Sequence, residues 1–203
     1  MDIFPKLLLS NLPPPTLCAI ALRRNSPLLL SIALSSLFIP LHAQAQSHIL
    51  VVGGVPPAQK ILSAGTEGDY VDLYKTDDGS GRQRWFIENQ KHGYVHILVA
   101  GGTPPKRKFL SVSEDGMTVD LFNKDDGSGR QRWFIENQPG GFVHIRIAGG
   151  TPSDHAFLSV SSDGTKIDLT DMDHGTGRQR WTIDSAPPPP PNPVPPASGA
   201  GIH

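Results

Sequence analysis

The sequence predicts an all-β protein that contains three copies of a four-stranded unit. Glycine and proline, 21 and 20 of the 203 residues, are too frequent for long helices. A Gln-x-Trp triplet recurs every 48 residues, as Gln83 and Trp85, Gln131 and Trp133, and Gln179 and Trp181. Within these copies, no window of ten residues or more has helical periodicity. Together these observations favour short strands separated by turns.

The repeat is long and regular. Residues 48–95 and 96–143 share 31 of 48 positions without a gap, and the third copy diverges more but keeps the spacing. The same interval relates three histidines, three Gly-Gly pairs and three aspartates: His48, His96 and His144; Gly53, Gly101 and Gly149 with the glycine that follows each; and Asp72, Asp120 and Asp168. Repetition at a fixed period indicates one structural unit used three times.

Four strands are predicted in each copy, and the second copy shows the pattern. His96–Ala100 is apolar and ends at a Gly-Gly turn, and Phe109–Ser113 alternates large and small residues up to the turn signal at Asp115. Thr118–Phe122 alternates again. A polar, glycine-rich loop then leads to Gln131–Glu136, the fourth predicted strand.

The arrangement of the three copies follows by elimination. Three units are too few for a propeller, where 4–8 is usual. An open solenoid needs distinctive end repeats, and these copies are nearly equivalent. The sequence therefore predicts closure around a three-fold axis, with Leu, Ile and Trp of each copy in one shared core.

The two ends of the chain differ from the repeats. The paired arginines Arg23 and Arg24 precede an uncharged apolar run, 27–41, and a small-x-small motif ends at Ala45, so residues 1–45 are predicted to be a signal or export segment. That run is shorter than the roughly 20 residues of a spanning helix, and no membrane span is expected after cleavage. Residues 187–203 are rich in proline and are predicted to be a disordered tail or a linker.

Composition excludes several kinds of function. The net charge of −1 gives no basic surplus for nucleic acid, and the single cysteine, Cys18, excludes disulfides within the chain and four-cysteine zinc sites. The repeated histidines have no closely spaced partner that would complete a metal set, so they are interpreted as structural or exposed. No metal and no cofactor are predicted.

The repeated Gln-x-Trp triplets resemble the signature of the ricin B-type β-trefoil lectins. The resemblance covers about residues 47–185 and implies a β-trefoil that binds glycans or glycoconjugates. The predicted domain is 46–186, with lobes at 47–94, 95–142 and 143–186. In that family the Gln and Trp are mainly structural. The resemblance therefore implies structural roles for Gln83, Trp85, Gln131, Trp133, Gln179 and Trp181.

Sugar contacts in the family come from an Asp in the second strand, an aromatic residue that ends the third, and an Asn before the Gln. Matching positions here hold Ser63, Ser111 and Ser159, then Tyr74, Phe122 and Thr170, then Arg82, Arg130 and Arg178. Lobe 3 therefore lacks the aromatic platform. Sugar-binding candidates in lobes 1 and 2 are Ser63, Tyr74, Asp77, Asp78 and Arg82, and Ser111, Phe122, Asp125, Asp126 and Arg130. The alternative is that Asp72, Asp120 and Asp168, or the loop aspartates, pair with these arginines and hold the loop in shape.

A feature repeated three times suits binding better than catalysis, because several weak sites on one rigid body gain avidity. The sequence therefore predicts a secreted, periplasmic or extracellular carbohydrate-binding module without enzymatic activity. Two alternatives stay open. One is a protein-binding β-trefoil, such as a protease inhibitor or a receptor-binding module of a toxin. The other is an accessory module of an enzyme.

Overall fold

The computed structural model describes residues 45–161 and 163–185. The chain divides into two units, Met1–Leu41 and His42–His203, and every described residue lies in the second. The predicted Pro-rich tail and the predicted export segment, apart from Ala45, lie outside the described residues. The three repeats are called lobes 1, 2 and 3.

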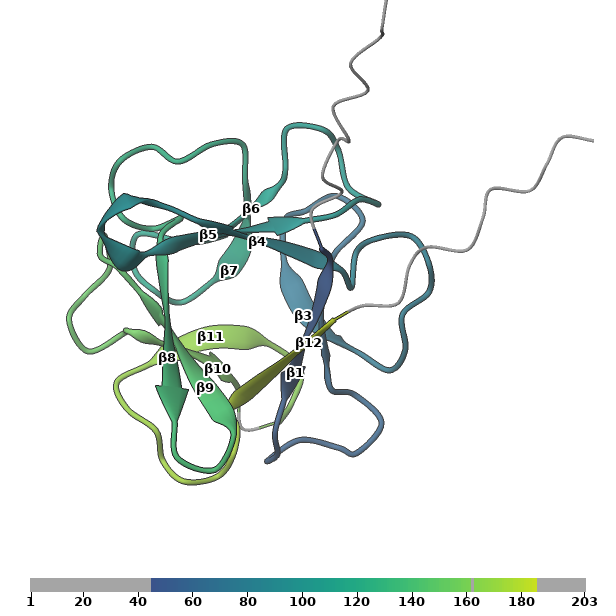
Figure 1. Ribbon diagram of the computed structural model, residues 1–203, viewed down its shortest axis with the longest axis vertical. Coiled ribbons are helices and arrows are strands. Elements are labelled where there is room, and N and C mark those ends of the chain that lie inside the picture. The colour runs from purple at the N-terminus through teal and green to yellow at the C-terminus, as the bar shows by residue number, and fades with distance from the viewer. Residues whose placement is uncertain (1–44, 162, 186–203) are drawn as a thin grey trace, which may run out of the picture. The chain divides into compact units, whose positions relative to one another are not determined.

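Each lobe contributes four strands, and within the described ranges these strands and one 3-10 turn, η1 (Lys91–Gly93), are the regular structure (Figure 1). Lobe 1 contains β1 (Ser47–Val51), β2 (Ile61–Ala64), β3 (Val71–Tyr74) and β4 (Trp85–Asn89). Lobe 2 contains β5 (Val95–Val99), β6 (Phe109–Val112), β7 (Val119–Phe122) and β8 (Trp133–Gln138). Lobe 3 contains β9 (Phe142–Ile147), β10 (Phe157–Val160), β11 (Ile167–Thr170) and β12 (Trp181–Ser185).

The predicted strand positions in lobe 2 hold to within two residues, and the largest shift has a clear cause. Strand β8 begins at Trp133, although the sequence predicts a start at Gln131. The amide of Arg132 instead donates to the carbonyl of Gly129 (3.0 Å), so Gln131 and Arg132 lie in a turn. This turn directs the Gln131 side chain into the interior.

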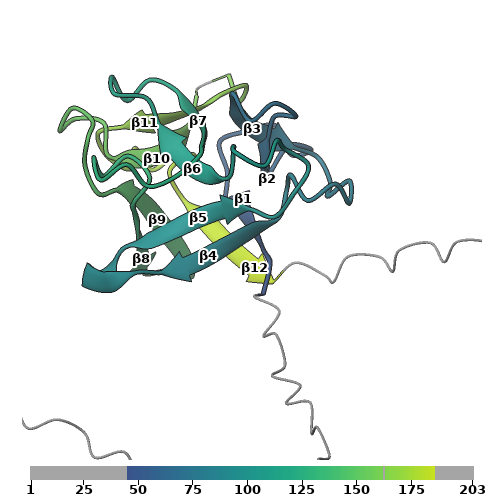
Figure 2. The ribbon, with the colours of Figure 1, turned by 90° about the horizontal axis from the view of Figure 1, so that it is seen from above.

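Six of the strands form a closed ring of antiparallel pairs. Following the pairing leads from β1 to β4, β5, β8, β9, β12 and back to β1. Three hairpins, β2–β3, β6–β7 and β10–β11, are attached to this ring through β1, β5 and β9. Figure 2 shows the hairpins gathered at one end of the ring. Closure leaves no free strand edge in the ring itself, where such an edge would invite association.

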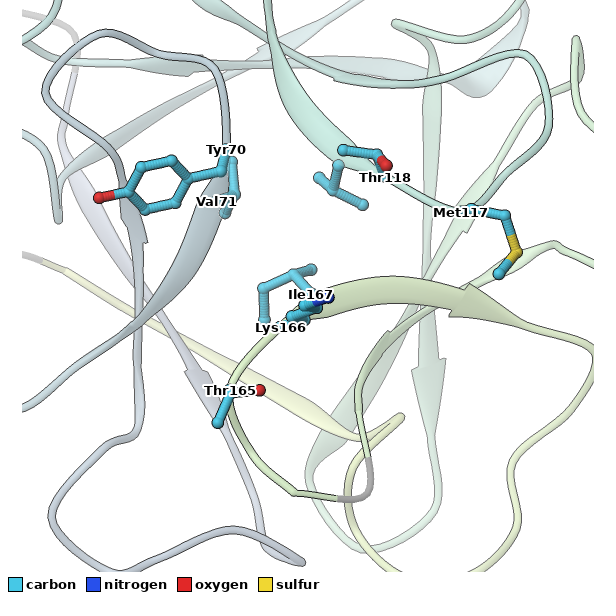
Figure 3. Close-up of a pocket in the computed structure, with 8 residues that line it drawn as sticks. Tyr70, Val71, Met117, Thr118, Thr165, Lys166 and Ile167 are labelled. Atoms are coloured by element: carbon cyan, nitrogen blue, oxygen red, sulfur yellow. The ribbon is translucent and has the colours of Figure 1, made fainter.

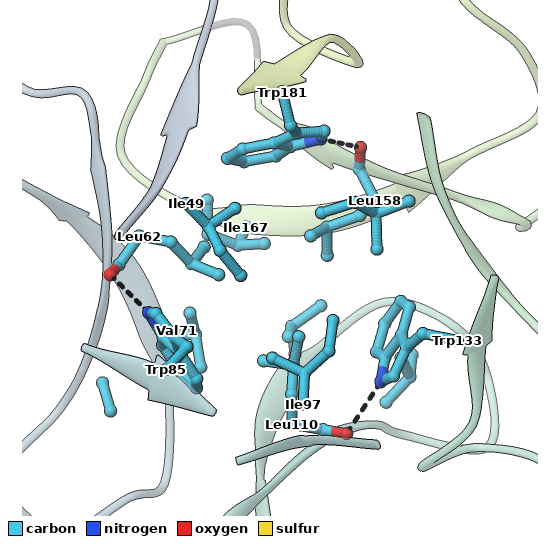
Figure 4. Close-up of a cluster of buried hydrophobic side chains, with 14 of the residues drawn as sticks. Ile49, Leu62, Val71, Trp85, Ile97, Leu110, Trp133, Leu158, Ile167 and Trp181 are labelled. Atoms are coloured by element: carbon cyan, nitrogen blue, oxygen red, sulfur yellow. Dashed lines mark hydrogen bonds between the residues drawn. The ribbon is translucent and has the colours of Figure 1, made fainter. Parts of the chain in front are cut away.

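The core repeats with the lobes. Trp85, Trp133 and Trp181 are fully buried, and they converge with leucine, isoleucine and valine from every lobe (Figure 4). Each indole N–H donates to the carbonyl of the leucine in the second strand of its own lobe: Leu62 (2.9 Å), Leu110 (3.0 Å) and Leu158 (2.9 Å). The tryptophan therefore ties the fourth strand to the hairpin and satisfies its own polar group.

Glycine contacts lock neighbouring lobes together. Gly129 has φ of +101°, and a Cβ at this position would lie 3.0 Å from the backbone of Gly149 in the next lobe. The equivalent contacts join Gly81 to Gly101, and Gly177 to Gly53 across the junction of lobes 3 and 1. Only glycine permits this backbone and this approach. The first glycine of each Gly-Gly pair therefore lies at a close backbone contact between lobes.

Candidate functional site

The glutamine of each Gln-x-Trp triplet lies in a buried hydrogen-bond network. Gln131 Nε2 donates to Ser111 Oγ (2.9 Å), and its Oε1 accepts from the amide of Asp126 (3.2 Å). Lobe 1 repeats both bonds, from Gln83 to Ser63 (3.0 Å) and from the amide of Asp78 to Gln83 (3.3 Å).

This network corrects the interpretation of two predicted sugar contacts. Ser63 and Ser111 are 1% and 2% exposed, and each hydroxyl is occupied by the glutamine of its lobe. Ser159 is equally buried and accepts from Gln179 (2.8 Å), in the lobe that lacks an aromatic platform. The serines therefore anchor the loop, and a ligand on the surface does not reach them.

The first loop aspartate of each lobe joins a histidine and an arginine. Asp125 Oδ2 is 3.0 Å from His96 Nε2 and 2.7 Å from Arg132 Nε, and Oδ1 accepts from the amide of Gly127 (2.9 Å). The same three bonds recur around Asp77 and Asp173. The repeated histidines are therefore partners of loop aspartates, and they tie the first strand of each lobe to the loop before the fourth.

The second loop aspartate binds the arginine that precedes the glutamine. Arg82 Nη2 lies 2.6 Å from Asp78 Oδ2, and Arg130 Nη2 lies 3.1 Å from Asp126 Oδ2. Lobe 3 has His174 at this position, and there Arg178 donates to Thr176 Oγ1 (3.2 Å). The loop aspartates therefore pair with the arginines, as the structural alternative expected, and their carboxylates also cap the turn amides of Gly79, Ser80, Gly127 and Ser128.

These bonds shift the pKa of the loop carboxyls. Partial burial by itself would raise the pKa of Asp125, but hydrogen bonds from Arg132, Gly127 and His96 outweigh burial and lower it to about 2. The pKa of Asp77 and that of Asp173 are also lowered, by the same balance of burial against arginine, backbone and histidine bonds. Each carboxylate therefore favours the folded state in its ionised form.

We expect the domain to lose stability in acid. An Asp with a lower pKa in the folded state than its unfolded value near 3.9 stabilises the fold above that value and loses this contribution as the pH falls toward about 2. Thermal unfolding from pH 6 to pH 2 should show a falling Tm below about pH 4. Asp125→Asn should lower the Tm at pH 6 and flatten the acid profile. A profile unchanged by Asp125→Asn would contradict this role of the carboxylate.

Two aromatic side chains end the third strands of lobes 1 and 2. Tyr74 is 42% exposed, and the guanidinium carbon of Arg82 lies 6.0 Å from its ring centre. Phe122 is half-buried and lines a cleft of about 220 Å³ together with Lys106, Arg107 and Asn123. The cleft was not predicted from the sequence, because Lys106 and Arg107 follow a different turn from the one that carries the Gln-x-Trp triplet.

A half-buried aspartate lies on the same face of each hairpin as the aromatic position. Burial raises the pKa of Asp120 to about 6, although Arg107 and Arg130 act in the opposite direction, and Asp69 raises it further. Asp120 Oδ2 lies 3.7 Å from Arg107 Nη1. Burial also raises the pKa of Asp72 and of Asp168. Carboxyl oxygens beside an aromatic ring are groups that hydroxyl-rich ligands use.

A second cavity, of about 330 Å³, lies where the three hairpins meet (Figure 3). Buried Val71, Val119 and Ile167 occupy equivalent positions of the three lobes in its lining. Tyr70 and Met117, 49% and 62% exposed, lie at its edge. The residues at its edge differ between lobes, whereas those of its floor are alike.

The described part of the chain lacks two features. Among residues 45–161 and 163–185, no three His, Cys, Asp or Glu side chains are grouped as a metal ion would require. No helix in this part of the chain has the length and apolar character needed to span a membrane.

Comparison with known proteins gives structural neighbours only. No protein-family model and no curated protein sequence matches the chain. Among solved structures, the chain is similar to a mosquitocidal holotoxin (19% identity, TM-score 0.55), covering 71% of this chain and 18% of that one. It is also similar to ThreeFoil, a designed three-fold symmetric protein (18% identity, TM-score 0.53), covering 70% of this chain and 99% of that one.

A third neighbour is a GlcNAcα1-4Gal-releasing endo-β-galactosidase from Clostridium perfringens (11% identity, TM-score 0.55). This similarity covers 70% of this chain and 33% of the enzyme. The chain thus spans a minor part of the toxin and of the galactosidase, and nearly all of ThreeFoil. At these identities the similarity shows the fold alone, which is all-β and resembles a β-trefoil.

Proposed function

We propose that this chain is a secreted, non-catalytic carbohydrate-binding domain, a β-trefoil of the ricin B type with sugar sites in lobes 1 and 2. The observation that carries the proposal is the pair of aromatic side chains at the ends of β3 and β7. Tyr74 is exposed, and Phe122 lines a cleft beside cationic and amide side chains. Sugar rings stack their apolar face on such aromatic surfaces, while polar neighbours bind the hydroxyls.

The loop network supports a revised version of the predicted sites. Asp77, Asp78, Asp125 and Asp126 hold the loops through internal bonds, so they shape the sites more than they contact a ligand. Arg82 and Arg130 are bound to the second aspartate of each pair. The proposed contact residues are therefore Tyr74 with Asp72 in lobe 1, and Phe122 with Asn123 and Asp120 in lobe 2.

The neighbours favour an accessory role as a further part of the proposal. The region similar to this chain makes up 18% of the toxin and 33% of the galactosidase, so the fold occurs within larger proteins. A domain with this role directs an attached activity to a glycan surface and needs no catalytic group of its own. Two sites in one domain would raise its residence on a polyvalent surface.

Aromatic variants test the proposal. The double variant Tyr74→Ala/Phe122→Ala should weaken retention on immobilised glycans about tenfold or more, because both stacking surfaces and the avidity between them are lost. Thr170→Ala is the matched control, since Thr170 ends the third strand of lobe 3, and it should bind like the native chain. The measurement is affinity chromatography on a broad panel of neutral and acidic glycans, with thermal unfolding to verify the fold of each variant.

Two results would contradict the proposal. One is a native chain that no glycan in the panel retains. The other is a double variant that is folded and retained as strongly as the native chain. Capture of a protein partner that free sugars do not displace would favour the protein-binding alternative instead.

A further inference from the structure

The three lobes differ most in charge at one place, the loop before the second strand together with the end of the third strand. In lobe 2, residues 104–108 and 120–124 carry Lys106, Arg107, Lys108 and Lys124 against Asp120. The equivalent residues of lobe 1 carry Lys60 and Lys75 against Asp72, and those of lobe 3 carry Asp154, Asp168 and Asp171 with no lysine or arginine. A repeat that is otherwise nearly uniform thus has one cationic, one nearly neutral and one anionic lobe.

The cations of lobe 2 lie where a ligand of Phe122 would reach them. Lys106 and Arg107 line the cleft of about 220 Å³ with Phe122 and Asn123. Arg107 Nη1 donates to the carbonyl of Leu121 (2.8 Å) and lies 3.7 Å from Asp120 Oδ2. One edge of the guanidinium is therefore fixed to the strand that carries Phe122. Lys106 is exposed, and no ion pair of the described residues includes it.

We propose that the lobe 2 cleft binds a pyranose ring that carries an anionic group, either a carboxylate or a sulfate ester. This inference rests on the proposed carbohydrate-binding function and names the ligand class of one of its two sites. The ring stacks on Phe122, the amide of Asn123 binds hydroxyls, and Lys106 with Arg107 binds the anion. Arginine matches the planar pair of oxygens of a carboxylate or sulfate, and an ammonium group adds a point charge.

The loop before the second strand has the same turn in all three lobes, so residues of one lobe can be placed in another as test variants. The turn that carries these cations is held by the same bond in all three lobes: the amides of Gln59, Arg107 and His155 donate to the carbonyls of Pro56, Pro104 and Pro152 at 3.1, 2.9 and 3.0 Å. Lys106→Ala/Arg107→Gln places the lobe 1 residues Ala58 and Gln59 in lobe 2. The reverse variant, Ala58→Lys/Gln59→Arg, places the cations beside Tyr74.

The experiment uses pairs of ligands in which one member carries the anionic group and the other carries it masked or removed. Oligogalacturonate and its methyl ester test the carboxylate, and sulfated and desulfated galactan oligosaccharides test the sulfate. Titration calorimetry of the full chain at 0.1 M NaCl should give about three- to tenfold tighter binding of at least one charged member than of its neutral partner. Lys106→Ala/Arg107→Gln should abolish this preference. Lys91→Ala, which removes an exposed lysine from η1, should leave it unchanged.

Acidity and the reverse variant give independent readouts. Asp120 is the carboxylate on the face of the cleft and is faced by Arg107, Arg130 and Asp69. Its protonation as the pH falls from 7.5 to 5 removes a repulsive charge, so binding of a sulfated ligand should tighten in that range. Ala58→Lys/Gln59→Arg should raise the preference for the charged ligand by adding a second anion site.

The outcomes separate this inference from the function on which it rests. Native chain that binds glycans but shows no preference for either charged member overturns the inference and leaves the proposed function standing. So does a preference that survives Lys106→Ala/Arg107→Gln. A native chain that binds neither the charged nor the neutral glycans overturns both. In a competition experiment, inorganic sulfate and the free sulfated oligosaccharide compete, at the same concentration, with the immobilised charged glycan for the chain. Equally strong competition by the two would also overturn the inference, because the sugar ring would then contribute nothing to binding.

Discussion

Replacement of Trp133 by alanine is expected to lower the free energy of unfolding by about 4 kcal/mol. The indole is fully buried in the shared core, and its N–H donates to the carbonyl of Leu110 (3.0 Å). The variant would leave a large cavity and a buried carbonyl without its donor, and both effects add to the loss. Urea unfolding followed by circular dichroism measures this quantity.

The tryptophans at the equivalent positions of lobes 1 and 3 allow the stability cost to be compared between lobes. Trp85→Ala and Trp181→Ala should cost about as much as Trp133→Ala, because all three indoles are fully buried and make the same bond. Met117→Ala is the control, since this side chain is 62% exposed and its loss should change stability by about 0.5 kcal/mol or less. A cost below about 2 kcal/mol for the tryptophan variants would contradict a shared, tightly packed core.

Replacement of Gly129 by alanine is expected to cost about 3 kcal/mol. Two penalties combine at this position. The φ of +101° is unfavourable for any residue with a Cβ, and that Cβ would lie 3.0 Å from the backbone of Gly149. Because backbone lies on both sides of the contact, no side chain can rotate away, and the two lobes would have to separate. Thermal unfolding compared with the native chain measures the effect.

The variant Gly127→Ala measures the cost of a positive φ without the cost of a close backbone contact. The φ of Gly127 is +86°, but a Cβ there would meet no atom within 4 Å. Gly127→Ala should therefore cost about 1 kcal/mol from backbone strain alone. If Gly127→Ala and Gly129→Ala destabilised the chain equally, close contact between lobes would not be the reason for the glycine at position 129.

The all-β class and the strand positions could be predicted because they depend on local patterns. The sequence itself shows the alternation in 118–122, the turn glycines and the 48-residue interval. The sequence places the start of β8 two residues too early, because the turn at Arg132 depends on a hydrogen bond to Gly129 that no periodicity reveals.

The candidate site was harder to predict, because burial is a property of the folded chain. Ser111 matches a family sugar-binding position in the sequence, but its hydroxyl is inside and bound to Gln131. A usable signal was present: the Ser–Gln spacing of 20 residues recurs in lobe 3, which lacks the aromatic residue. Features common to all three lobes hold the fold, whereas the proposed ligand class rests on Lys106 and Arg107, which only lobe 2 has.

The pairing of β1 with β12 places the two ends of the described domain side by side, since Ser47 and Ser185 are register partners. At the other two junctions between lobes this place in the ring is occupied by a continuous connection: η1 between β4 and β5, and a short turn between β8 and β9. The ring therefore has three equivalent junctions at which the ends of a chain could lie, and in the described domain the ends lie at the junction of β1 and β12. A circular permutant that begins after η1 would keep every strand pair, so the order of the lobes along the gene is separable from their order in space.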